Sequence, residues 1–164
     1  MRPAQAVLLG LALAGSPGCD GPPQSGFLWD VDLTGSHDQC AGGAADSYHE
    51  ALTYVLQFAD AGNGVRVGVV KDGDPVPFAV GSVAGCEVTY SSVVWEDTRD
   101  GYPLRWKIDG SATWRTAGDL ACGLAPGVDW AGNEVVTVVG SDDPDYAAGC
   151  TVDLDVVGTY QGEL

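Results

Sequence analysis

Apolar and polar residues alternate along most of this chain, and this period of two constrains the fold more than any other feature. The clearest example is Trp29-Asp30-Val31-Asp32-Leu33. Because successive side chains of a β-strand point to opposite faces, the alternation predicts strands with one apolar face each. About eight strands are expected, at 29–33, 52–58, 65–70, 76–80, 86–95, 104–115, 134–139 and 152–156.

Short stretches of turn-forming residues separate the expected strands. Asp60–Gly64 and Lys71–Pro75 are rich in the Gly, Asp, Asn and Pro that tight turns favour. Two stretches break the pattern: one helical turn is expected within 43–52, and the glycine-rich segment 118–132 is expected to be a long loop. Short strands joined by hairpins predict an all-β antiparallel meander, with a barrel preferred over a sandwich.

The N-terminal residues have the order of a secretory signal. One positive charge at Arg2 precedes an apolar run from Ala6 to Ala14, which small residues follow. The run is shorter than the roughly 20 residues that a membrane-spanning helix needs, so export is predicted rather than a lasting span. Two cleavage positions are open. Cleavage after Ala14 leaves all 5 cysteines in the mature chain, an odd number that strands one thiol, whereas cleavage between Gly18 and Cys19 makes Cys19 the first residue.

Ser16-Pro17-Gly18-Cys19 resembles the lipobox of bacterial lipoproteins. The resemblance implies a signal peptide at 1–18, a lipidated Cys19 that begins a flexible tether at 19–26, and a single β domain at 27–164. The protein would then be anchored on the periplasmic or cell-surface face of a bacterial membrane. Lipidation of Cys19 leaves an even number of cysteines for disulfides. The alternative is a soluble exported protein in which Cys19 is a free thiol or forms an intermolecular bridge.

The expected barrel predicts how the other cysteines pair. In a closed meander of eight strands the first and last strands are antiparallel neighbours, which brings Cys40, after the first, close to Cys150, before the last. Cys86 opens a strand that pairs with the one preceding Cys122. Of the possible pairings, Cys40–Cys150 with Cys86–Cys122 is therefore favoured.

Charge and motifs argue against several classes of function. The formal net charge is -16, and nucleic acid is not an expected partner because phosphate binding needs clustered Lys and Arg. His37 and His49 are the only histidines, and no nucleophile, nucleotide or metalloprotease motif accompanies them. We expect a protein without enzymatic activity. A hydrolase with a site built from loops is a lesser alternative.

One turn contains a candidate metal site. Asp142, Asp143 and Asp145 place three carboxylates close together, and calcium prefers oxygen ligands of this kind. The alternative is a turn that an Asp side chain stabilises, with its charges solvated. No other cofactor is expected.

Gly26-Phe27-Leu28-Trp29 is similar to the G-x-W opening of lipocalins. The resemblance implies a barrel that carries a small apolar ligand. Trp29 and Trp106 lie on apolar strand faces and are candidates for a ligand cup, with ordinary core packing as the alternative. The expected function is a membrane-anchored envelope lipoprotein with a binding or structural role, whose partner is an envelope protein or a small apolar ligand.

Overall fold

The computed structural model describes residues 26–41, 48–59, 63–99, 101–114 and 129–164. These parts of the chain contain nine strands and no helix. The strands are β1 (Gly26–Asp38), β2 (His49–Phe58), β3 (Gly64–Lys71), β4 (Asp74–Ala84), β5 (Glu87–Ser92), β6 (Trp95–Arg99), β7 (Tyr102–Trp114), β8 (Trp130–Ser141) and β9 (Thr151–Glu163).

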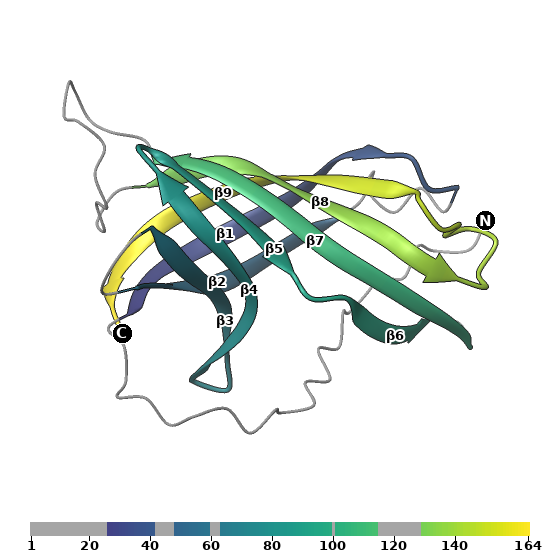
Figure 1. Ribbon diagram of the computed structural model, residues 1–164, viewed down its shortest axis with the longest axis horizontal. Coiled ribbons are helices and arrows are strands. Elements are labelled where there is room, and N and C mark those ends of the chain that lie inside the picture. Colours follow the sequence, from purple (N-terminus) through teal and green to yellow (C-terminus); the bar gives the residue numbers. More distant parts are fainter. Residues whose placement is uncertain (1–25, 42–47, 60–62, 100, 115–128) are drawn as a thin grey trace.

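The strands form an antiparallel barrel, as the sequence predicts (Figure 1). Their order is β5-β4-β3-β2-β1-β9-β8-β7-β6, and β5 also pairs with β7. That pairing closes eight of the strands into a ring and leaves β6 as an additional strand on β7. β1 and β9 are antiparallel neighbours, which is the closure that the cysteine positions require.

Three local expectations are corrected. The strand expected at 86–95 is two strands, because the chain breaks at Val93 and Val94 before pairing again with β7. The helical turn expected within 43–52 is wrong for 49–52, which belongs to β2 and pairs with β1; residues 42–47 lie outside the described part. The loop expected at 118–132 ends earlier, since β8 begins at Trp130 opposite Trp114.

The barrel is fully paired at one end and split at the other. β5 pairs with β4 only from Ala79 onward, so Asp74–Phe78 is bonded to β3 alone. β6 is bonded to β7 alone. Figure 1 shows the β3–β4 hairpin and β6 diverging, and we call this region the split end. Pro75 and Pro77 lie on the part of β4 that pairs with β3 alone, where their missing N–H groups discourage pairing of the free edge with another chain.

Aromatic side chains fill the paired end. Trp29 contacts Trp130 and Tyr160, with ring centroids 6.1 and 5.4 Å apart. The indole of Trp130 lies directly on Gly158, where an added Cβ would be 1.5 Å from Nε1. Glycine at this position therefore makes the packing of the aromatic core possible.

A disulfide joins the chain just after β1 to the chain just before β9. Cys40 and Cys150 are bonded, with their Cα atoms 5.1 Å apart, and this confirms the first predicted pair. A small apolar cluster with Val138 and Tyr146 surrounds it. Cys86 is also disulfide-bonded, while its predicted partner Cys122 lies outside the described residues, so that pairing stays a prediction.

Candidate functional site

A carboxyl group lies in the middle of the barrel. Glu134 is on β8, between Trp130 and Val138 on the face that points inward, and it is 0% exposed. Its neighbours across the sheet are Gly110 on β7 and Leu154 on β9. Burying an acidic group among apolar side chains is costly unless hydrogen bonds or a counter-ion compensate.

Two tyrosines bind one oxygen of this carboxyl group. The hydroxyls of Tyr54 and Tyr90 both donate to Glu134 Oε1, at 2.9 and 2.6 Å. Oε2 is buried and has no hydrogen-bond partner in the part of the chain that the structure describes. Tyr90 reaches Oε1 because its ring occupies the place of a side chain at Gly110, where an added Cβ would be 2.2 Å from the ring.

Phe78 packs against both tyrosines from the side of the split end. Its ring packs edge-to-face against Tyr54, at a centroid distance of 5.4 Å, and against Tyr90, at 6.3 Å. It is the last residue of β4 before pairing with β5 begins. Trp130 contacts Tyr54 from the paired end. Glu134, Tyr54, Tyr90 and Phe78 together are called the carboxyl site below.

The environment of Glu134 favours its neutral form. Burial raises its pKa above the ordinary value of 4.5, the hydrogen bonds from Tyr90 and Tyr54 lower it, and the charge of Glu50 adds a smaller increase. Burial and the Glu134 charge also raise the pKa of both tyrosines. Tyr48 donates a hydrogen bond to Glu50, and burial is the largest of the effects that raise its pKa.

Replacing Glu134 by Gln is expected to remove a loss of stability at high pH. A carboxyl group whose pKa is raised by folding stabilises the folded state below its unfolded pKa, and this contribution is lost as the pH rises through the folded pKa. Glu134→Gln should therefore gain stability relative to the wild type as the pH rises, by about 1–3 kcal/mol, the usual cost of an unsatisfied buried group. Urea unfolding from about pH 4 to about pH 9 measures this difference.

Glu87→Gln is the matched control, because Glu87 is an exposed carboxylate on β5. Its difference from the wild type should be small at every pH. A constant difference between Glu134→Gln and the wild type over the whole range would show that folding does not raise the Glu134 pKa.

Apolar inward-facing residues at the split end are only partly buried. Leu52, Val76, Trp95 and Ile108 pack on the edge of the main core. Trp95 stacks on Trp106 with a centroid distance of 5.4 Å and an interplanar angle of 12°. They form an apolar rim on the side of the carboxyl site where β4 pairs with β3 alone and β6 pairs with β7 alone.

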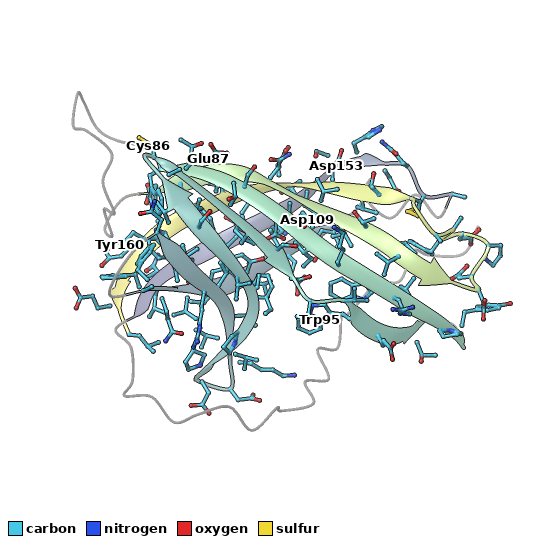
Figure 2. All side chains as sticks on the ribbon, in the orientation of Figure 1. Cys86, Glu87, Trp95, Asp109, Asp153 and Tyr160 are labelled. Atoms are coloured by element: carbon cyan, nitrogen blue, oxygen red, sulfur yellow. A yellow bond between two sulfur atoms is a disulfide. The ribbon has the colours of Figure 1, made fainter. Side chains whose placement is uncertain are left out.

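Trp29 and Trp106, the two candidates for a ligand cup, lie in different parts of the barrel. Trp29 is packed among the rings of the paired end, whereas Trp106 stacks with Trp95 near the split end. Figure 2 shows Trp95 at the start of β6 and Tyr160, a neighbour of Trp29, at the other end of the barrel. Of the two, Trp106 is the one placed near the rim.

The acidic turn after β8 is held by its own hydrogen bonds. Asp143 Oδ1 accepts from the N–H of Asp145 at 2.9 Å, and Ser141 Oγ accepts from the N–H of Asp143 at 2.9 Å. Asp142 is exposed. Within the described residues no group of three or more His, Cys, Asp or Glu could hold a metal ion, and calcium binding here stays a prediction. His37 and His49 are both exposed.

The carboxyl site is not predicted from the sequence. One signal marks it: Glu134 is the only charged residue on the face of β8 that also carries Trp130, Val136 and Val138. Its tyrosine partners come from strands 80 and 44 residues away. Such partners are found only once the register of the sheet is known.

Comparisons with known proteins give no match to any family model, any curated protein or any solved structure. Over the described residues no helix is long and apolar enough to cross a membrane.

Proposed function

We propose that this protein is an exported, lipid-anchored binding module that holds a small, mostly apolar ligand in its barrel and has no catalytic activity. The observation that carries the proposal is the carboxyl site, where Glu134 Oε2 is buried without a partner. Buried polar atoms in folded proteins almost always have a hydrogen-bond partner. A ligand that brings such a partner would explain why an acidic group lies in an otherwise apolar interior.

The barrel has suitable dimensions and an asymmetric interior. An eight-stranded barrel is just wide enough to be filled by side chains or to hold one small ligand. The paired end is filled by Trp29, Trp114 and Trp130. The split end has a partly exposed apolar rim. We place the ligand between this rim and the carboxyl site.

Binding of N-phenyl-1-naphthylamine, an uncharged apolar dye that fluoresces in apolar surroundings, tests this placement. Val136 is inward-facing and partly buried, two residues from Glu134, so Val136→Phe should fill the route from the split end. We expect this variant to weaken dye binding at least tenfold, roughly 1.4 kcal/mol. Fluorescence titration of the purified protein measures the affinity.

Val157→Phe is the matched control, because Val157 is 43% exposed on the outer face of β9. It should bind the dye as the wild type does. Equal affinities of all three proteins would show that the dye does not bind inside the barrel, and no binding by the wild type would contradict the proposed function.

The anchoring part of the proposal is supported by the Ser16-Pro17-Gly18-Cys19 sequence and the signal-like segment before it, which lie outside the described residues. With several acyl chains, Cys19 would hold the domain stably on a membrane. The intact mass of membrane-extracted protein tests this. We expect a chain that begins at Cys19 with added acyl mass, and a chain that begins at Gly15 without it would contradict lipidation.

A further inference from the structure

We propose that the ligand is a small organic cation, an amine on an apolar body, whose positive group pairs with Glu134 Oε2. This inference rests on the proposed function and names the chemical class of the ligand. It is argued from the missing counter-ion of Glu134, from the aromatic rings around it and from the charge of the chain.

Glu134 has no internal counter-ion among the described side chains. The two ion pairs there are Arg105–Glu96 and Lys107–Asp109, and all four of these side chains are at least one-third exposed. The hydrogen bonds to the Glu134 carboxyl group come from two neutral hydroxyls, and Oε1 accepts both of them. A cation at Oε2 would supply the missing hydrogen-bond partner and would favour the charged form of the carboxyl group, and charge-assisted hydrogen bonds are stronger than neutral ones.

Aromatic rings surround the carboxyl group. Phe78 contacts Tyr54 and Tyr90 edge to face, and Trp130 contacts Tyr54. The faces of aromatic rings attract cations, and this attraction grows where water is excluded. A site that joins one carboxylate to several rings therefore suits an ammonium group better than a neutral or negative one.

The charge of the whole chain favours the same class of ligand. A formal net charge of -16 attracts cations to the protein and repels anions. Phe78 lies where β4 stops pairing with β5, between the split end and both tyrosines. A cation that enters from this end would meet the Phe78 ring first and the carboxyl group behind it.

The test compares three probes of similar shape: 2-phenylethylamine, 2-phenylethanol and 3-phenylpropanoate. Their affinities for the full chain are measured by displacement of N-phenyl-1-naphthylamine and by isothermal titration calorimetry. We expect the amine to bind at least tenfold more tightly than the alcohol, and the carboxylate most weakly. Glu134→Gln should lose this preference by weakening amine binding and leaving alcohol binding unchanged, whereas Glu87→Gln should keep it.

Equal binding of amine and alcohol by the wild type, or tighter binding of the carboxylate, would overturn the cation proposal. Dye binding that is blocked by Val136→Phe would still support the proposed function in that case. If Glu134→Gln fails to fold, which circular dichroism reports, the order of the three probes on the wild type decides. An amine preference that Glu134→Gln retains would also overturn the role of Glu134.

Discussion

Replacing Trp130 by Ala should lower the free energy of unfolding by about 3–5 kcal/mol, the range for removing a large aromatic side chain from a core. Trp130 is 1% exposed and contacts both Trp29 and Tyr54. Gly158, on which the indole rests, has no side chain that could fill part of the space. Tyr54 would also lose its support on this side, so we expect weaker dye binding. Urea unfolding at neutral pH measures the loss of stability.

Tyr102→Ala is the control for this substitution, since it also removes a large aromatic side chain but at a position that is 44% exposed. Its effect should stay within about 0.5 kcal/mol, as for most surface substitutions. A loss for Trp130→Ala no larger than that for Tyr102→Ala would contradict the packing described for the paired end.

Removal of the Cys40–Cys150 disulfide by the double substitution Cys40→Ser and Cys150→Ser should lower the free energy of unfolding by about 2–5 kcal/mol. The bond joins residues 110 apart in sequence, and cross-links that close long loops restrict the unfolded chain the most. Both sulfurs also lie in the apolar cluster with Val138 and Tyr146. Urea unfolding without reductant measures the change.

The double substitution is preferable to chemical reduction, because Cys86 is also disulfide-bonded and a reductant would act on both bonds. The barrel should remain folded, since β1 and β9 pair along eleven positions independently of the disulfide. A loss of less than about 1 kcal/mol would show that the unfolded chain is already compact without this bond.

The strands and the closure of the barrel follow from the sequence because they depend on local alternation. Segments such as Trp29–Leu33 and Val152–Val156 have one apolar face each, and a closed sheet buries all these faces at once. The Cys40–Cys150 bond follows from the same closure, since it needs only the order of the strands.

The split end and the carboxyl site cannot be predicted from the alternation of apolar and polar residues, because they depend on strand register. The break after Ser92 sets where β5 stops pairing with β4, and a bulge shifts the register of β4 on β3 near Phe78. Glu134 meets Tyr54 and Tyr90 only in that register, and the glycine at position 110 leaves the space for the tyrosine ring. These positions come from strand register rather than from any local motif.

The central claim is that the ligand binds inside the barrel at Glu134, and the tyrosine rings report on it directly. The chain has 6 tyrosines, so ¹³C labelling of their rings gives a simple nuclear magnetic resonance spectrum. On addition of 2-phenylethylamine, we predict that the ring signals of Tyr54 and Tyr90 shift while those of the exposed Tyr102 stay in place. Unmoved signals of Tyr54 and Tyr90 under conditions where calorimetry shows the amine bound would contradict the claim.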